Sequence, residues 1–179
     1  HDQTGRELTV AHSRYHIREI VTVELSGVEL GRPGSAPGSS PFASRKITAR
    51  LPLRSILDRK PQIVSLEIDA PVVNLVRAAS GTGNWQLAQA AESTGTMAFA
   101  LPPTTVSNGT LIYTDEGAAT QLRLDAISAY IAADPQYGGA AANGTFTYNK
   151  EPLTFDLAVS DAAAAAAGRA TPLALSIDS

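Results

Sequence analysis

Alternating apolar and polar residues form the dominant pattern of this chain. Across residues 15–25 the odd positions are mostly apolar and the even positions mostly polar, with Glu19 and Ile20 as the two exceptions. A repeat of two sends successive side chains to opposite faces of a sheet, so the pattern predicts strands with one apolar and one solvated face. The same alternation recurs at residues 47–53, 64–68, 73–75, 122–131 and 153–159.

Two features interrupt or shift this alternation. Pro71 separates the apolar runs at 64–68 and 73–75, which predicts two strands there. The parity of the pattern changes by one residue at Ala126-Ile127, which predicts a β-bulge. From 106 to 159 strand patterns follow one another almost without a gap, and a last strand is expected from Pro172.

The remaining segments are short. Residues 31–44 are rich in Gly, Pro and Ser and are expected to form a loop. One or two helical turns are predicted at 55–60, and a small docking helix at 84–92 with Asn84 as its N-cap. Six consecutive alanines within 161–169 predict a brief helical connector.

Together these elements predict a mainly β fold in a single domain, residues 1–179. Its centre is a mostly antiparallel sheet with one apolar and one solvated face, accompanied by two or three short helices.

The composition excludes several classes of function. With 44% hydrophobic and 17% charged residues the chain is globular rather than disordered. A formal net charge of −3, with Lys and Arg scattered, provides no electrostatic surface for nucleic acid. The absence of cysteine excludes disulfides, iron–sulfur clusters, cysteine-ligated zinc and thiol nucleophiles.

No combination of residues indicates catalysis or a metal site. His12 and His16 lie four apart in a predicted strand, which separates their Cα atoms by about 13 Å, too far for one metal ion. Gly81-Thr-Gly-Asn-Trp lacks the third glycine and the βαβ context of a nucleotide-binding loop, so it predicts a turn. Acidic residues are spread singly, and only a glycosidase pair distant in sequence is left open. We expect no enzymatic activity, no catalytic residue and no cofactor.

Two similar stretches, Asn108-Gly-Thr and Asn143-Gly-Thr, indicate a weak internal repeat of a strand–turn–strand unit. Both match the pattern of a glycan acceptor, but that pattern is frequent by chance. Asn-Gly accepts positive φ, so we interpret both as backbone features that mark where each hairpin starts. Their alignment makes two pairs of positions equivalent: Leu111 with Phe146, and Tyr113 with Tyr148.

Six stretches form a series that covers nearly the whole chain: Thr4-Gly-Arg-Glu-Leu-Thr-Val, Leu51-Pro-Leu-Arg-Ser-Ile-Leu-Asp-Arg-Lys, Ile63-Val-Ser-Leu-Glu-Ile-Asp-Ala-Pro-Val-Val-Asn-Leu, Gly81-Thr-Gly-Asn-Trp, Asn108-Gly-Thr-Leu-Ile-Tyr-Thr-Asp and Asn143-Gly-Thr-Phe-Thr-Tyr-Asn-Lys-Glu-Pro-Leu. In this order they resemble the AsmA family of bacterial envelope proteins, including its TamB-like relatives.

The resemblance implies a periplasmic protein held in the inner membrane by one N-terminal helix, which would lie before His1. It also implies a curved, extended antiparallel sheet that forms a groove or a partly open barrel with an apolar interior. The resemblance further implies a part in phospholipid movement towards the outer membrane or in envelope integrity. Residues 1–179 would then be the membrane-proximal segment of a longer chain. The expected ligand is a phospholipid or another acyl chain.

A groove that holds acyl chains needs a continuous apolar lining. The residues expected to supply it are Leu111, Tyr113, Leu122, Leu124, Phe146, Tyr148, Phe155 and Leu157. The alternative is an ordinary core, in which this face packs on the Trp85 helix and the N-terminal strands. A second function class is a structural or interaction subunit of an inner-membrane-anchored complex, which pairs its sheet edges with another envelope protein and carries no lipid.

Overall fold

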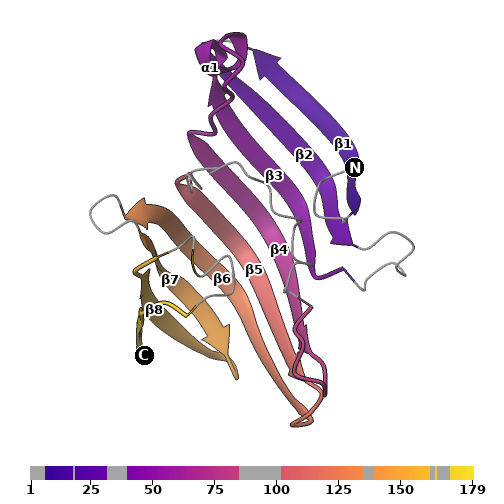
Figure 1. Ribbon diagram of the computed structural model, residues 1–179, viewed down its shortest axis with the longest axis vertical. Coiled ribbons are helices and arrows are strands. Elements are labelled where there is room, and N and C mark those ends of the chain that lie inside the picture. Colours follow the sequence, from indigo (N-terminus) through magenta and orange to yellow (C-terminus); the bar gives the residue numbers. More distant parts are fainter. Residues whose placement is uncertain are drawn as a thin grey trace.

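The fold, in a computed structural model of the chain, is one β-sheet of nine strands (Figure 1). The structure describes residues 7–17, 19–31, 40–84, 102–134, 139–161, 164 and 170–179. The strands are β1 Glu7–Ile17, β2 Ile20–Gly31, β3 Phe42–Pro52, β4 Ser65–Arg77, β5 Thr104–Asp115, β6 Thr120–Asp134, β7 Gly139–Tyr148, β8 Glu151–Val159 and β9 Leu173–Asp178. A short helix, α1 Leu53–Leu57, follows β3.

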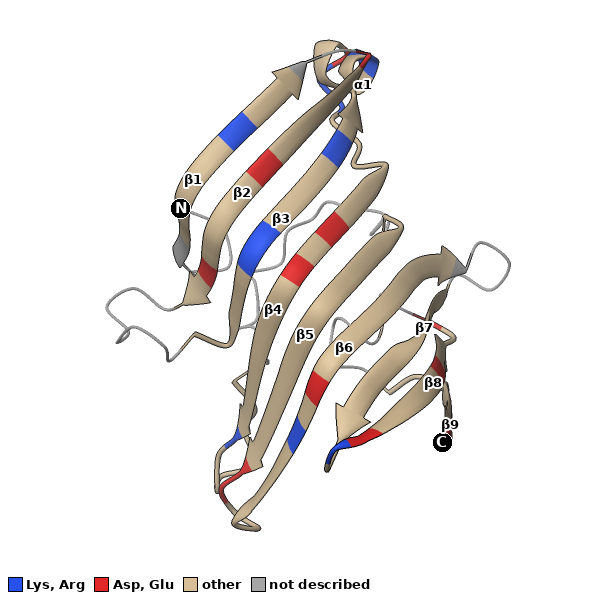
Figure 2. Cartoon of the chain, turned by 180° about the vertical axis from the view of Figure 1, so that it is seen from behind, with Lys and Arg blue, Asp and Glu red and all other residues tan. Residues whose placement is uncertain are grey.

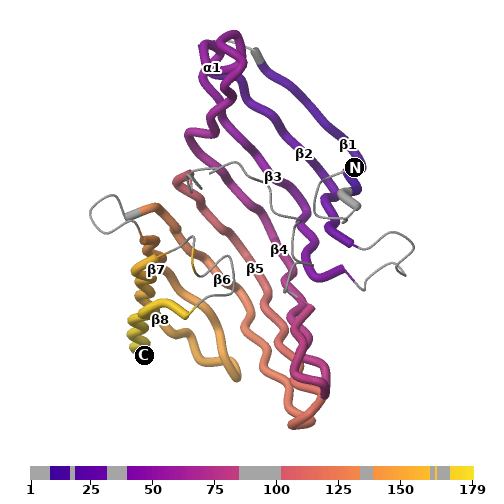
Figure 3. Tube along the Cα trace, viewed as in Figure 1, coloured from indigo at the N-terminus to yellow at the C-terminus, as the bar shows by residue number. Residues whose placement is uncertain are grey.

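The strands lie side by side in chain order, from β1 at one edge to β9 at the other, and the sheet is not closed (Figures 1 and 3). All neighbouring pairs are antiparallel except β4 and β5, which run parallel. A parallel pair needs a crossover, here residues 78–103. The sheet therefore consists of two antiparallel meanders, β1–β4 and β5–β9, joined along one parallel seam. The predicted mainly β, open sheet is confirmed.

Two predicted strand boundaries are wrong. Residues 15–25 form no single strand, because β1 ends at Ile17 and β2 begins at Ile20, with Ile17 paired to Val21 in a hairpin. Residues 64–75, in contrast, lie almost entirely in the single strand β4, although it contains Pro71. The ladder between β4 and β5 skips residues 70 and 71, so the missing N–H of Pro71 costs no hydrogen bond there.

The predicted loop and helices also differ from the structure. The loop at 31–44 is shorter than expected, since Gly31 still belongs to β2 and β3 begins at Phe42. Helix α1 starts two residues before the predicted turn at 55–60 and ends at Leu57, where the chain turns through Arg59 with a φ of 55°. The predicted helix at 84–92, Trp85 included, and most of the connector at 161–169 lie outside the described residues.

A line of irregular positions crosses β2 to β6, and we call it the crease: Gly27, Arg45, Ala70, Asn108 and Ala126. The cross-strand pairs skip these positions, and all of them except Arg45 have a φ between 47° and 61°. An inserted residue bends a strand and shifts its alternation by one, while the apolar side chains stay on the same face. The bulge predicted at Ala126-Ile127 is confirmed and is one member of this line.

The two Asn-Gly-Thr stretches do not start hairpins, so that interpretation is wrong. Both lie inside strands, in β5 and β7. Asn108 does adopt positive φ, as a member of the crease, and the Gly109 beside it is buried. Gly144 is required for a different reason, because a Cβ there would lie 2.0 Å from the carbonyl oxygen of Ser128 on β6.

The described elements form a single layer. Substantial contacts join only neighbouring strands, and α1 with β3. The N-terminal strands thus extend the sheet sideways and do not cover its apolar face, which contradicts that part of the core alternative. The accessible surface is 12425 Å², against about 8,200 Å² for a compact protein of this mass. Among the described residues, the buried apolar side chains are those of Val21, Val28, Ala129, Phe146 and Ala164.

The face of β2 to β4 that lies opposite the apolar face carries ion pairs between neighbouring strands. Lys46 Nζ lies 2.9 Å from Glu24 Oε1, and Arg50 Nη1 lies 2.6 Å from Glu67 Oε1. Viewed from behind, acidic β2 and β4 alternate with basic β3 (Figure 2). Such exposed pairs stabilise the sheet weakly, but their alternation sets strands of opposite charge side by side.

Replacement of Gly144 by alanine tests the close approach of β7 to β6. The added Cβ meets backbone, which cannot move aside, so Gly144→Ala should lower the free energy of unfolding by about 3 kcal/mol. Urea denaturation followed by circular dichroism measures this. Gly81→Ala is the control: Gly81 has a φ of 86° but no atom within 4 Å of the added Cβ, so it should cost only about 1 kcal/mol. Equal losses in the two variants would contradict the proposed clash.

Acidification should destabilise the fold. Lys46 lowers the pKa of Glu24 from its ordinary 4.5, Arg123 lowers that of Asp125, and the N–H of Ala118 lowers that of Asp115. A carboxyl whose folded pKa is depressed stabilises the fold above its unfolded pKa, and this stability is lost as pH falls through the folded value. The free energy of unfolding should therefore drop below pH 4.5, and less steeply in Glu24→Gln. Identical pH profiles for the variant and the parent would refute the contribution of Glu24.

Candidate functional site: an apolar groove

One apolar face extends across all nine strands. Cross-strand partners point to the same face of a sheet, so rows of partners trace that face. The first row is Tyr15, Val23, Ala49, Leu66, Thr104, Ile131, Ala142, Leu157 and Leu175. The second row is Ser13, Leu25, Ile47, Ile68, Val106, Ala129, Gly144, Phe155 and Ile177. Mostly apolar residues therefore continue from strand to strand, interrupted by Thr104 in the first row and by Ser13 in the second.

On β5 to β9 this face is hollowed into a groove of about 600 Å³. Its size falls in the range of roughly 300–1,000 Å³ that is common for small-molecule sites. The described residues that line it are all aliphatic or aromatic: Leu111, Leu122, Leu124, Ile127, Phe146, Tyr148, Leu153, Phe155, Leu157, Leu173, Leu175 and Ile177. None of the described residues in this lining is Asp, Glu, His, Lys or Arg.

The floor of the groove is more buried than its rim. Phe146 is 8% exposed, and its ring centroid lies 5.9 Å from that of Phe155, with the planes tilted by 49°. Tilted aromatic pairs at this separation are favourable. Leu173 and Leu175 on the edge strand β9 are 61% and 55% exposed. The groove is thus anchored on β7 and β8 and open towards β9.

The structure brings together nearly all of the predicted lining residues. Leu111, Leu122, Leu124, Phe146, Tyr148, Phe155 and Leu157 all line the groove. Tyr113 does not, but it pairs with Leu122 and so lies on the same face, one row nearer the end of β5. The equivalence of Leu111 and Phe146 agrees with their shared position in the groove. That these residues contact a lipid stays a prediction.

Five lining residues were not predicted: Ile127, Leu153, Leu173, Leu175 and Ile177. The alternation itself could have identified them. Leu153 has the parity of Phe155 and Leu157, and the odd positions 173–177 are apolar in the expected last strand. The alternation of β6 shifts by one residue at the crease, just before Ile127. Ile127 is therefore assigned to this face only when the bulge is taken into account.

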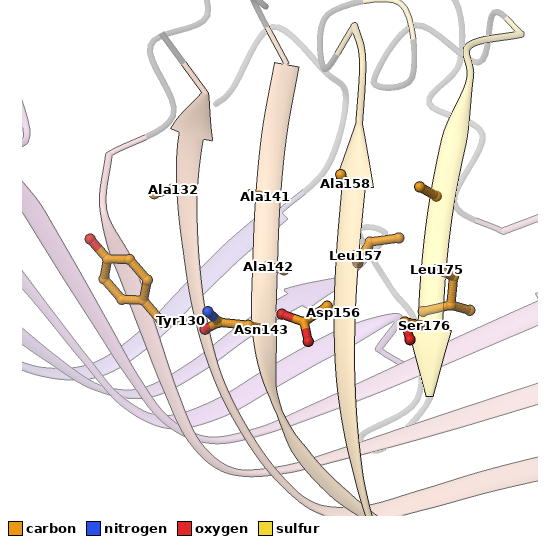
Figure 4. Close-up of a pocket in the computed structure, with 11 residues that line it drawn as sticks. Tyr130, Ala132, Ala141, Ala142, Asn143, Asp156, Leu157, Ala158, Leu175 and Ser176 are labelled. Atoms are coloured by element: carbon orange, nitrogen blue, oxygen red, sulfur yellow. The ribbon is translucent and has the colours of Figure 1, made fainter. Parts of the chain in front are cut away.

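A second hollow, of about 470 Å³, lies across β6 to β9 (Figure 4). Tyr130, Asn143, Asp156 and Ser176 form a row of cross-strand partners along it, on the face opposite Leu157. Neighbouring members of this row stand on adjacent strands, whose backbones lie about 4.8 Å apart. Their side chains therefore project from the sheet side by side. Side chains that do not converge offer no shared point for chemistry, so the apolar groove is the better candidate.

The Gly81-Thr-Gly-Asn segment forms a turn, as predicted. Gly83 makes a bridge with Arg77, and the side chain of Asn84 accepts a hydrogen bond from the N–H of Val76 while donating one to the carbonyl oxygen of Asn74. The turn therefore completes the edge of β4 beyond the end of β3. No helix within the described residues is long and apolar enough to cross a membrane, and no cluster there could hold a metal ion.

Truncation of Phe146 should reveal the anchoring role of the groove floor. Phe146→Ala removes a buried ring and its contact with Phe155, so the free energy of unfolding should fall by about 3 kcal/mol. Leu173→Ala, on the exposed rim, should cost less than about 1 kcal/mol. Urea denaturation of both variants gives the comparison. A small loss for Phe146→Ala would show that the floor does not support the sheet.

Comparison of this chain with protein-family models and with curated proteins finds no match in either.

Proposed function

We propose that the chain is a non-enzymatic, lipid-handling segment in which the groove on β5 to β9 holds an acyl chain. The single observation that supports this is a groove whose described lining residues are all aliphatic or aromatic, on a sheet whose described elements form one layer. An exposed apolar surface of this kind favours an apolar ligand over a polar substrate.

The energetics favour an acyl chain. Each methylene taken out of water contributes about 0.8 kcal/mol, so even a partly covered chain gains several kcal/mol in total. The groove supplies no charge, and an extended hydrocarbon needs none. Because Leu175 and Ile177 leave the groove open at β9, a lipid could enter or leave from the side without a lid. The headgroup would then remain in solvent.

The biological setting follows from the resemblance to the AsmA family and is part of the proposal. In that setting the protein is periplasmic, anchored in the inner membrane by a helix that precedes this segment. It contributes to phospholipid transport or to outer-membrane integrity in the cell envelope of Gram-negative bacteria. The rows of apolar partners, which continue across all nine strands, suit such a path better than a closed pocket would.

A second candidate function is an interaction subunit that uses its sheet edge and carries no lipid. Strand β9 favours it, because all six of its residues are exposed and none is Lys, Arg or Pro. Natural proteins usually protect an edge strand with such residues or with a bulge. An unprotected edge accepts a further strand through backbone hydrogen bonds. The partner would be another envelope protein.

Native mass spectrometry of the purified chain tests lipid binding. Incubated with phosphatidylglycerol and phosphatidylethanolamine, the parent should retain about one phospholipid. Leu175→Asp places a charge in the groove at an exposed position and should reduce bound lipid at least about tenfold. Ser176→Asp, the next residue on β9 but on the opposite face, is the matched control and should bind as the parent does.

The outcomes separate the two functions. Loss of lipid in Leu175→Asp alone supports the groove. Equal lipid in both variants, or none in the parent, rules the groove out. A stoichiometric protein partner that is lost when β9 is made basic by Ala174→Lys, with no lipid bound, would favour the interaction subunit.

A further inference from the structure

The end of the sheet at α1 exposes a cluster of aliphatic side chains, which we call the tip: Ile20, Ile56, Leu57, Ile63 and Val64. Their exposed fractions are 42%, 40%, 70%, 45% and 43%. Figure 1 shows α1 beyond the ends of β1 to β4, away from β7 and β8. The tip is therefore separate from the groove.

The tip has a defined backbone and does not depend on a loose loop. The N–H of Leu53 donates to the carbonyl oxygen of Glu19, which ties α1 to the β1–β2 hairpin. The N–H of Val64 donates to the carbonyl oxygen of Arg50, at 2.9 Å, as the chain returns to β4. Helix α1 has no buried residue. Ile56 and Leu57 on this helix therefore leave much of their side chains open to solvent.

Three cations accompany these aliphatic residues. Arg54, Arg59 and Lys60 are exposed, and none of them takes part in an ion pair within the described residues. The acidic groups nearby in sequence are Asp58 and Glu19, so cations are in excess. The basic residues of β3 are paired with carboxylates. The other described cations without an ion pair, Arg14 and Lys150, stand singly in the sequence, whereas three fall within residues 54–60 at the tip.

We propose that the tip docks on an anionic lipid bilayer. Aliphatic side chains would enter the interfacial region, while the flanking Arg and Lys would reach phosphate groups with their long side chains. Each basic residue near an anionic surface contributes on the order of 1 kcal/mol, and the carboxylates offset part of this. Charge complementarity is what favours a bilayer over an apolar protein surface, which would leave three cations without partners.

The arrangement fits shallow docking and no deeper insertion. Helix α1 has five residues, far short of the roughly 20 that span a bilayer. The apolar side chains come from β2, from α1 and from the segment before β4, which backbone hydrogen bonds join at this end of the sheet. Docking would leave the groove free and does not rest on the proposed lipid-handling function.

Co-sedimentation of the whole chain with vesicles tests docking. One set contains phosphatidylethanolamine with phosphatidylglycerol, and the other contains phosphatidylcholine alone. We expect the anionic vesicles to bind at least about tenfold more tightly, and this preference to weaken with salt. Leu57→Glu combined with Ile63→Glu should abolish binding to both sets. Arg59→Glu combined with Lys60→Glu should remove the preference for anionic vesicles.

Tyr130→Glu is the matched control, because it places the same charge at an exposed hydrophobic residue, 49% accessible, that belongs to neither the tip nor the groove. It should bind anionic vesicles as the parent does, and circular dichroism should show that all variants remain folded. Absence of binding to anionic vesicles overturns the proposal. So does equal binding to the two vesicle sets, or binding that Leu57→Glu with Ile63→Glu leaves intact.

Discussion

The apolar face of a sheet in a single layer is the constraint on which this structure depends. A β-sheet normally buries one face against a second sheet or against helices. Here the substantial contacts among the described elements join neighbouring strands, and α1 with β3. The accessible surface greatly exceeds that of a compact protein of equal mass. Stability must therefore come from cross-strand pairs, from backbone ladders and from whatever covers the apolar face. An acyl chain in the groove would supply part of that cover.

The crease explains how such a sheet can curve and still keep one face apolar. Five strands change parity at one line, and at four of its positions the residue has positive φ. Without this shift, half of each strand would turn its aliphatic side chains to the charged face. Alanine at positions 70 and 126 accepts positive φ only at a cost. The backbone is therefore locally strained along this line, and the same irregularity keeps the apolar surface continuous.

The sequence predicted the strands well and the non-local features poorly. Alternation identified the apolar face and most of the groove, because side-chain direction follows a simple repeat of two. It could not separate β1 from β2, since a tight hairpin at Glu19 preserves nearly the same alternation as a continuous strand. Pro71 predicted a break between two strands, but β4 continues through it. The proline is tolerated there because the ladder with the neighbouring strand β5 skips this residue. The parallel seam and the tip depend on contacts distant in sequence, which a local pattern does not contain.

The parallel pairing of β4 with β5 has a consequence for how the chain acquires its structure. Seven of the eight ladders join strands that follow each other closely in sequence, whereas the seam joins two strands that 26 residues, 78–103, separate. Closure entropy grows with loop length, so the two meanders form at lower entropic cost than their junction. During synthesis β1–β4 would emerge first, with the edge of β4 unpaired until β5 arrives. That interval, more than the finished protein, is when a chaperone would protect this chain from aggregation.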